Sequence, residues 1–435
     1  MSALIEPRLL KGFRDFLPER ESQRLALTRR LEEALRLFGF SPIDTPVLEY
    51  AEILLGKGGG ETDKQVFRFT DSGGRDVALR YDLTVPFARF MAAHLSELPL
   101  PFKRYHAAKA WRGENTQRGR YREFMQVDFD IVGTDTASAD LEILLAVNEC
   151  MARLGIEGFT IRYAHRGVFS SFLSRLGLFE KAADVLRIID KERKIGTDKT
   201  TEMLAEIIGD ALAAKVMDFI IVKSSTQETL DKIRAAAGED ADGITRLAEL
   251  ARCLTDLGHE ARFILDPSIT RGLDYYTGLV CETFLDALPE IGSICSGGRY
   301  NELASLYTRH SLPGVGASLG LDRLMAAMEE LGSLPGAAAG PAVLVLFLDD
   351  ALISSYHRFA AELRAAGIPA EVYPEKKKLS AQFAYAEKRG IRFALIHGED
   401  EAAKDTVGLK DLKSRESWQG LKPAEAVEKT RQLLR

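Results

Sequence analysis

The chain has 435 residues, too many for one ordinary hydrophobic core, so two or three domains are expected. Hydrophobic residues make up 46% and charged residues 28% of the chain, a balance that excludes a disordered protein. The formal net charge of -6 excludes a nucleic-acid packaging protein, which would be basic, so any RNA contact must use local basic patches.

The beginning of the chain carries no targeting pattern. Residues 1–20, MSALIEPRLLKGFRDFLPER, show neither the apolar centre of a signal peptide nor an Arg- and Ser-rich presequence. No stretch approaches the roughly 18 apolar residues of a membrane span. The cysteines Cys150, Cys253, Cys281 and Cys295 form no metal-ligand spacing. A cytoplasmic protein with reduced thiols, no membrane partner and no metal held by its own side chains is expected.

The N-terminal part alternates between helical and extended patterns. Apolar residues at helical spacing predict a helix over residues 20–38, with Gly39 at the C-terminal cap. Residues 40–50 are predicted to be extended, because Pro42 and Pro46 exclude a helix. Short strand-like runs separated by turns follow from residue 66 to residue 132 and indicate an antiparallel sheet. A helix over residues 136–155 closes this block, with Thr136 or Ser138 as its N-cap.

The rest of the chain suggests an insertion and a second domain. Helical patterns dominate from about residue 170 to 255 and contain few site-like residues, whereas strand signals return at 262–296. A Gly-, Ala- and Pro-rich linker runs from 332 to 341. Strands and helices alternate beyond it, which predicts a small α/β domain. The expected domains are therefore residues 1–331, containing the insertion, and residues 342–435.

An arginine-rich stretch, residues 111–126, is the densest group of polar residues. Its arginines lie around a polar loop between two strand-like runs: Arg112, Arg118, Arg120 and Arg122. A guanidinium group is a planar fork of donors that suits phosphate oxygens. Such a hairpin could hold a nucleoside triphosphate in its stem and RNA phosphates at its loop, although a solvated hairpin tip would show the same pattern.

Three further segments combine glycines with charged or phenolic residues. These segments are TRGLDYYTG at 270–278, SGGRYNEL at 296–303 and GVGASLGLDRL at 314–324. Glycines permit close approach of a ligand or of neighbouring backbone. Each segment alone is equally compatible with a tight turn, because Gly-x-Gly patterns are common.

Together these segments resemble the three signature motifs of class II aminoacyl-tRNA synthetases, in the order that the class requires. FGFSPIDTPVLE resembles motif 1, which contains Pro46 and builds a dimer interface. WRGE with the following loop and REFMQVDFD resembles motif 2, and GVGASLGLDRL resembles motif 3. TRGLDYYTG and SGGRYNEL are similar to the two histidine-specific peptides of the histidyl-tRNA synthetase family, and KGFRDFLPE and LRYDLTVPFARF are also similar to that family. One departure is Tyr81-Asp82-Leu83-Thr84, where many bacterial members have Pro-Glu-Gly-Thr.

This resemblance covers essentially the whole chain and implies a fold and an activity. The implied fold is an α+β class II catalytic domain, an antiparallel sheet flanked by helices with a helical insertion, followed by a C-terminal α/β anticodon-binding domain. The implied activity is ATP-dependent activation of L-histidine and its transfer to the 3′ end of tRNA(His). ATP with Mg²⁺ would be the co-substrate, and the family is homodimeric.

The resemblance also assigns roles to individual residues. The histidine-binding residues would be Asp82, Thr84 and Gln126 at the α-ammonium group, Asp130 and Tyr276 at the imidazole, and Tyr275 and Tyr300 nearby. The catalytic arginines would be Arg271 and Arg112 at the α-phosphate and Arg323 at the γ-phosphate. Glu114 would lie near the adenine of ATP or near the tRNA terminus, and Arg120 would also belong to the ATP site. The tRNA-binding residues would be Gln117, Arg118, Arg120 and Arg122 at the acceptor end, where the family recognises an extra 5′ guanosine, and Lys376, Lys377 and Lys378 in the C-terminal domain. A solvated charge run would explain the three lysines equally well.

Two other functions are less compatible with the sequence. The regulatory subunit of ATP phosphoribosyltransferase resembles the same catalytic core, but such proteins typically lack the C-terminal domain and have degraded signature peptides. Here Arg112, Arg271 and Arg323 are all present, as are the last hundred or so residues. An RNA-binding sensor fused to a kinase is excluded because the sequence has no kinase-like segment.

Overall fold

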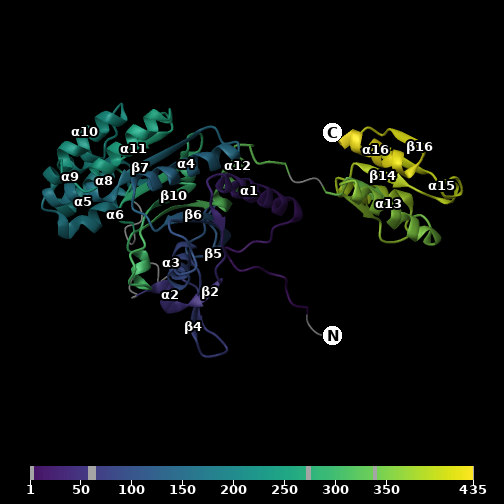
Figure 1. Cartoon of the computed structure of the whole chain (residues 1–435), viewed down its shortest axis with the longest axis horizontal. Helices are drawn as coiled ribbons and strands as arrows, with labels where there is room; N and C mark the ends of the chain where they lie inside the picture. The colour runs from purple at the N-terminus through teal and green to yellow at the C-terminus, as the bar shows by residue number, and fades with distance from the viewer. Residues whose placement is uncertain (1–3, 57–64, 271–275, 337–339, 435) are drawn as a thin grey trace. The chain divides into compact units, whose positions relative to one another are not determined.

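The computed structural model describes residues 4–56, 65–270, 276–336 and 340–434. The chain divides into two compact units, Met1–Pro335 and Gly336–Arg435, each with its own sheet and hydrophobic core (Figure 1). The division falls inside the Gly-, Ala- and Pro-rich stretch at 332–341, where few apolar side chains are available to join a core.

An eight-stranded sheet forms the centre of the first unit, in the order β1-β5-β6-β11-β10-β9-β7-β8. Its strands are β1 (Ser41–Pro42), β5 (Phe102–Trp111), β6 (Glu123–Val132), β7 (Phe159–His165), β8 (Phe263–Leu265), β9 (Leu279–Leu285), β10 (Cys295–Arg299) and β11 (Gly314–Gly320). The inner pairings are antiparallel, as predicted, but β1 pairs with β5 and β8 with β7 in parallel. The sheet is therefore mixed, because β8 follows a long helical crossover that permits parallel pairing.

A smaller sheet, in the order β2-β4-β3, lies beside two helices that the sequence patterns did not indicate. These elements are β2 (Leu48–Tyr50), α2 (Ala51–Leu55), β3 (Arg68–Thr70), β4 (Asp76–Leu79) and α3 (Thr84–Ala93). Helix α3 lies within residues 66–132, a stretch interpreted as strands and turns. It tolerates Pro86 because the first turn of a helix leaves its N–H groups unpaired. The Val85 N–H instead donates to Asp82 Oδ1 at 3.0 Å, which fixes Asp82 at the start of α3.

Helices α1 (Pro18–Leu37), α4 (Ala137–Arg153) and α12 (Leu321–Glu330) cover the large sheet (Figure 1). Leu31 of α1 and Phe129 of β6 are fully buried in the resulting core. Helix α4 begins as predicted, because the side chain of Thr136 accepts a hydrogen bond from the Ala139 N–H at 3.3 Å. Gly39 follows the end of α1 with a φ of +76°, a conformation that glycine adopts without strain.

The insertion between β7 and β8 is helical, as predicted, and forms the teal group on one side of the first unit in Figure 1. Its helices are α5 (Arg166–Arg175), α6 (Ala182–Ile189), α7 (Glu192–Ile195), α8 (Thr197–Ile208), α9 (Asp210–Ile220), α10 (Thr226–Ala237) and α11 (Ile244–Asp256). Phe172 of α5 stacks on Phe219 of α9, with 4.0 Å between the ring centroids. The buried residues of the insertion belong to the same hydrophobic core as those of the large sheet. The insertion is therefore packed firmly against that sheet.

His165, at the end of β7, is buried where the insertion meets the sheet. A side chain at position 243 would place its Cβ 2.0 Å from His165 Nδ1, so Gly243 lets the loop before α11 pack on the ring. Burial is the largest cause that lowers the pKa of His165 to about 4. His165 is therefore neutral in the folded protein at neutral pH.

The stability of the first unit is expected to fall as the pH drops from 6.5 towards 4. In that interval the unfolded chain binds a proton at residue 165 and the folded chain does not, so protonation favours unfolding by up to about 1.4 kcal/mol per unit of pKa difference. Urea unfolding at pH 7 and pH 5 measures the loss, and His165→Asn is expected to make it smaller. An equal loss in the variant and the wild type would contradict the assignment.

The second unit contains a five-stranded sheet in the order β13-β12-β14-β15-β16. Its elements are β12 (Val343–Val345), α13 (Ile353–Ala365), β13 (Ala370–Val372), α14 (Leu379–Lys388), β14 (Phe393–Ile396), α15 (Glu399–Lys404), β15 (Val407–Asp411), β16 (Ser417–Leu421) and α16 (Pro423–Leu434). The three parallel strands and the helices α13, α14 and α16 match the predicted alternation. The β15–β16 hairpin was missed, because glycine, lysine and aspartate in its strands are poor strand formers.

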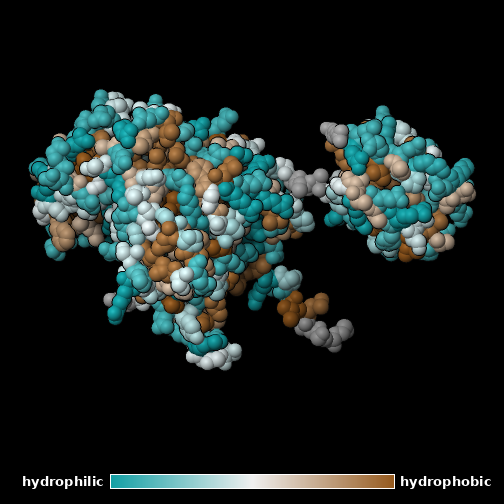
Figure 2. Space-filling view, in the orientation of Figure 1, coloured by the Kyte–Doolittle hydropathy of each residue, from teal (hydrophilic) through white to brown (hydrophobic). Residues whose placement is uncertain are grey.

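Hydrophilic residues cover most of the face of both units seen in Figure 2. Among the described residues, no helix is at once long enough and apolar enough to cross a lipid bilayer.

Candidate functional site

A cavity of about 390 Å³ opens on the large sheet of the first unit. Strands β6 and β11 form its floor, and the start of α3 and the loop between β5 and β6 form its walls. The cavity is lined by these predicted site residues: Asp82, Thr84, Arg112, Glu114, Arg120, Gln126, Asp130, Tyr276, Tyr300 and Arg323. Residues more than 200 positions apart in the chain therefore meet in one cavity.

One end of the cavity is acidic and buried. Strand β6 alternates its side chains between the two faces of the sheet, so Gln126, Asp128 and Asp130 share one face. Asp82 reaches the same end from the start of α3. Burial raises the pKa of Asp82 and of Asp130, and it raises the pKa of Asp128 to about 7.

Arg104 of β5 is the buried counter-ion of this acidic end. It is fully buried, and its Nη2 lies 2.6 Å from Asp130 Oδ2. Its guanidinium carbon also lies 4.2 Å from the centre of the Phe87 ring. Because a buried charge needs a partner, the Arg104–Asp130 pair fixes the position of the carboxylate predicted to read the imidazole.

Two glycines make room for the predicted histidine-reading groups. A side chain at position 316 would place its Cβ 2.0 Å from Asp130 Oδ1, and one at position 298 would place its Cβ 2.9 Å from the Tyr276 ring. The Tyr300 hydroxyl donates a short hydrogen bond to Asp130 Oδ1. The glycines of SGGRY and GVG therefore serve close packing around Asp130 and Tyr276.

The other end of the cavity carries the arginines. Arg112 follows β5, and its Nε donates to the Tyr81 carbonyl at 2.9 Å. Arg323, at the start of α12, donates from Nη1 to the Ser293 carbonyl at 2.5 Å. Arg120 lies 3.6 Å from Glu114. These guanidinium groups give this end a positive potential suited to a polyphosphate.

The predicted RNA-contacting residues of the β5–β6 loop lie in different surroundings. Gln117 and Arg118 are exposed at the tip, where Arg118 pairs with Glu330 at 2.8 Å. Arg122 is half-buried, and its Nε lies 3.3 Å from the Glu114 carbonyl that accepts its hydrogen bond. Gln117 and Arg118 are therefore more exposed to solvent than Arg122.

The remaining predicted residues lie elsewhere. Arg271 and Tyr275 lie outside the described residues. Lys376, Lys377 and Lys378 are exposed before α14 in the second unit. Lys377 pairs with Glu375 at 2.5 Å, so part of the lysine charge is balanced locally.

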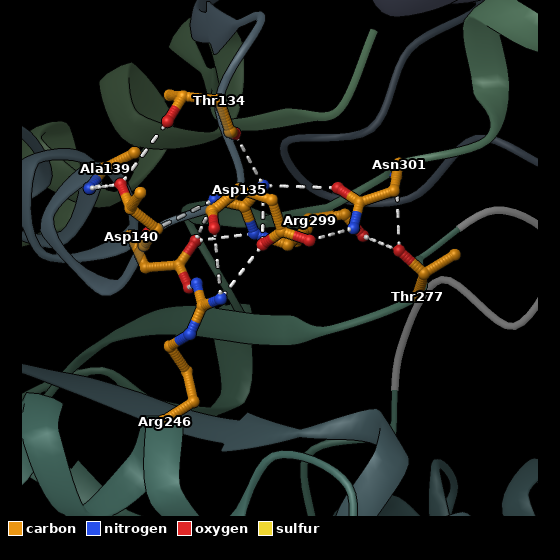
Figure 3. A network of polar contacts seen from close by, with 9 residues as sticks. Thr134, Asp135, Ala139, Asp140, Arg246, Thr277, Arg299 and Asn301 are labelled. Atoms are coloured by element: carbon orange, nitrogen blue, oxygen red, sulfur yellow. Dashed lines mark hydrogen bonds and ion pairs between the residues drawn. The ribbon is translucent and has the colours of Figure 1, made fainter. Parts of the chain in front are cut away.

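A network of charges anchors the SGGRY peptide (Figure 3). Arg299 is 2% exposed, and its Nε and Nη2 donate to Asp140 Oδ1 at 2.9 and 2.7 Å. Arg246 of the insertion helix α11 donates to the other oxygen, Asp140 Oδ2, at 2.8 Å. The Arg299 carbonyl accepts from the Thr277 N–H at 2.7 Å. The network thus connects the insertion, α4 and both peptides that carry Tyr276 and Tyr300.

Asp128, Arg104 and Arg299 were not among the predicted site residues. Asp128 could have been found, because it lies between Gln126 and Asp130 at the two-residue spacing of one strand face. Arg104 and Arg299 carried no comparable signal, since a charged residue within a strand usually faces solvent.

Among the described residues, no group of three or more His, Cys, Asp or Glu side chains is arranged to hold a metal ion. The carboxylates at the arginine end of the cavity already have partners within the protein. Glu114 pairs with Arg120, and Asp322 accepts from the Met125 N–H at 2.6 Å.

Comparison with known proteins matches most of the chain to two family models. The family model for histidyl-tRNA synthetase matches residues 12–324, and the model for an anticodon binding domain matches residues 342–433. A "Histidine--tRNA ligase" from Treponema denticola is 48% identical over an alignment of 430 residues, and the match covers 95% of this chain and 96% of that protein.

Solved structures give the same result for the fold. The crystal structure of a histidyl-tRNA synthetase from Nostoc sp. PCC 7120 matches with a TM-score of 0.86 and 33% identity, covering 99% of this chain and 100% of the other. A protein from Bacillus halodurans C described as an "ATP phosphoribosyltransferase regulatory subunit/histidyl-tRNA synthetase" matches with a TM-score of 0.75. It is 23% identical, covers 88% of this chain and 97% of its own, and shares the fold.

Proposed function

The chain belongs to the histidyl-tRNA synthetase family, and we propose that its cavity holds histidine at the acidic end and ATP at the arginine end. The enzyme is a histidine–tRNA ligase, which activates histidine with ATP and transfers it to tRNA. The observation that carries the proposal is the division of one cavity into a buried acidic end and an arginine-lined end.

At the acidic end, Asp82, Thr84 and Gln126 receive the α-ammonium group of histidine. Asp130 accepts a hydrogen bond from one imidazole nitrogen, and Tyr276 contacts the ring, with Tyr300 holding Asp130 in place. Such a polar pocket rejects apolar amino acids, because they would leave its buried polar groups unpaired. Tyr275 is assigned to the same end by the family resemblance.

At the arginine end, Arg112 binds the α-phosphate of ATP and Arg323 the γ-phosphate, beside Glu114 and Arg120. Arg271 is assigned to the α-phosphate by the family resemblance. Mg²⁺ enters as part of the ATP substrate and is held mainly by phosphate oxygens, as is usual for this ion.

The first chemical step needs positioning rather than a general base. The carboxylate of histidine is ionised at neutral pH and attacks the α-phosphorus directly, forming histidyl-adenylate and releasing pyrophosphate. The barrier arises from bringing two anions together, and fixed arginines lower it by stabilising charge on the phosphoryl oxygens. The adenylate then acylates the 3′-terminal ribose of tRNA(His), with AMP as the leaving group.

RNA contacts are assigned to two basic regions. The loop tip with Gln117 and Arg118, together with Arg120 and Arg122, faces the acceptor end. Lys376, Lys377 and Lys378 contact phosphates of the anticodon stem-loop. Both regions are local, which agrees with a chain whose net charge is -6.

A homodimer is proposed for the functional enzyme. The segment resembling motif 1 exposes the apolar side chains of Val47 (42%), Leu48 (39%) and Tyr50 (49%), and Phe69 of β3 is 47% exposed. Grouped apolar residues of this kind are typical of an interface between subunits. A cytoplasmic location is proposed with it, as the place where tRNA is charged.

The alternative function, a regulatory subunit that does not charge tRNA, has weaker support. The Bacillus halodurans C protein whose description includes a regulatory subunit is 23% identical to this chain. The Treponema denticola ligase is 48% identical to it. This chain also has the anticodon-binding domain over residues 342–433.

ATP–pyrophosphate exchange with each of the twenty amino acids tests the proposed function. We expect histidine alone to support exchange, because only an imidazole pairs with Asp130 and Tyr276. Exchange with a different amino acid would overturn the assignment of the acidic end. An absence of exchange by folded protein would instead favour the regulatory alternative.

A further inference from the structure

Three carboxylates are buried together at the acidic end of the cavity. Asp82 is 8% exposed, Asp128 1% and Asp130 2%. Asp130 forms a close ion pair with Arg104. Because Arg104 forms its close ion pair with Asp130, ionisation of all three buried carboxylates carries a large free-energy cost. The site is therefore matched to a ligand that brings a positive charge.

Asp128 is connected to two of the three residues proposed to hold the ammonium group, to Thr84 directly and to Gln126 through Ser318. Its Oδ1 accepts a hydrogen bond from Ser318 Oγ at 2.5 Å, and Ser318 Oγ in turn accepts from Gln126 Nε2 at 2.8 Å. Its Oδ2 lies 3.5 Å from Thr84 Oγ1. Asp128 therefore lies between Thr84 and Gln126, within the part of the cavity proposed to bind the ammonium group.

The Gln126 side chain provides an independent indication of a donor-bearing ligand. Gln126 is 8% exposed, and its Oε1 has no hydrogen-bond partner among the described residues, although its Nε2 is engaged. A buried acceptor without a partner is costly, so an incoming N–H group would be favoured there. An ammonium group offers three such donors.

We propose that Asp128 is a direct ligand of the α-ammonium group of histidine, sharing that group with Asp82 and Gln126. The inference rests on the proposed function of the cavity. It adds Asp128 to the residues that select histidine. In the free enzyme at neutral pH the Asp128 carboxyl is protonated in part of the molecules. Histidine binding expels this proton to solvent, and the resulting carboxylate pairs with the ligand's ammonium group.

The surroundings of Asp128 support this exchange of a proton for an ammonium group. Burial is the largest cause that raises the pKa of Asp128 to about 7, and the charges of Asp130 and Asp82 add to it. The groups that face Asp128 from neighbouring elements are Arg104 and His106 of β5, Asp130 of β6, Ser318 of β11, Asp82 and Thr84 at the start of α3, and Arg80 after β4. Arg104 opposes the rise but is itself engaged by Asp130. An arriving ammonium group would lower this pKa and release the proton.

The test compares ligands that differ only in the ammonium group. Equilibrium binding of L-histidine and of 3-(imidazol-4-yl)propionate, which lacks the amine, is measured on wild type and on Asp128→Asn. We expect the variant to bind histidine about 10- to 100-fold more weakly, as for loss of a hydrogen bond to a charged group, and the propionate within about 2-fold. Equal weakening of both ligands, or of neither, would overturn the proposal.

Proton release gives a second readout that does not depend on affinity. Calorimetric titrations with histidine at pH 7, in phosphate and in Tris, yield the number of protons released on binding. The ligand's own imidazole contributes equally to both proteins and therefore cancels in the difference. We expect the wild type to release about half a proton more than Asp128→Asn. Equal release would contradict the protonated state of Asp128 in the free enzyme.

Matched variants separate a binding role from general damage. Asp411→Asn also removes a buried carboxylate, but in the second unit, and is expected to leave both affinities unchanged. Ser318→Ala retains Asp128 and deletes its hydrogen bond, so histidine binding should weaken about 3- to 10-fold without a change for the propionate, even if Asp128→Asn fails to fold. Wild-type exchange with histidine is recorded in parallel, so failure of the proposed function would be seen separately.

Discussion

Replacement of Arg112 by alanine is expected to lower the rate of histidine-dependent ATP–pyrophosphate exchange by at least about 100-fold. Arg112 lines the arginine end of the cavity, and its Nε is fixed by the Tyr81 carbonyl at 2.9 Å. A guanidinium held in this way stabilises the charge that develops on the α-phosphoryl oxygens without reorganising during the reaction. The loss should therefore appear in kcat as well as in kcat/KM.

An exposed arginine provides the control for Arg112. Arg252 pairs with Asp256 on the surface of α11, with 65% of its side chain exposed, and Arg252→Ala should change exchange by less than about 2-fold. Histidine binding measured without ATP should be nearly unchanged in Arg112→Ala. A variant whose KM for ATP rises while kcat stays the same would show that Arg112 binds ATP equally in the ground state and the transition state.

Replacement of Arg299 by methionine is expected to lower the free energy of unfolding of the first unit by about 3 to 5 kcal/mol. Arg299 is buried and donates two hydrogen bonds to Asp140, which is 0% exposed. Methionine would leave that carboxylate with Arg246 alone, and the Thr134 carbonyl and Asn301 would each lose a donor. Burial already raises the pKa of Asp140, and the charges of Arg299 and Arg246 oppose that rise.

The two tryptophans make this measurement specific to one unit. Trp111 lies in the first unit and Trp418 in the second, so urea unfolding followed by fluorescence in a Trp418→Phe background reports the first unit. Arg252→Met should cost less than about 0.5 kcal/mol. Because replacing both partners of a buried pair costs less than removing one, Arg299→Met with Asp140→Leu should be more stable than Arg299→Met alone. The opposite order would show that the pair does not carry the stability.

Much of the fold followed from local patterns. The helix at 20–38, the N-cap at Thr136, the helical insertion and the α/β alternation after the linker could all be predicted, because apolar periodicity and capping residues act over a few positions. Helix α3 was missed because Pro86 reads as a helix breaker unless its place in the first turn is known. The two parallel edge pairings, β1 with β5 and β8 with β7, join segments that no local pattern connects.

In the candidate site, too, some features followed from local sequence patterns and others depend on contacts between distant segments. Its residues were predicted from contiguous peptides that resemble a known family, and ten of them line one cavity. The partners that give those residues their properties come from elsewhere in the chain. Arg299 and Asp140 are separated by 159 positions, and Arg246 and Asp140 by 106. No spacing rule identifies such a pair.

By itself the sequence determined the family, the two-unit organisation and the chemical groups available for the reaction, because these depend on residue identity and short-range order. Only the tertiary structure decided which carboxylates are buried together, which one Arg104 neutralises, and that Asp128 stands between Thr84 and Gln126. The physical reason is that burial and charge pairing are set by neighbours in space. Those neighbours are brought together by sheet pairing and core packing, which no single segment specifies.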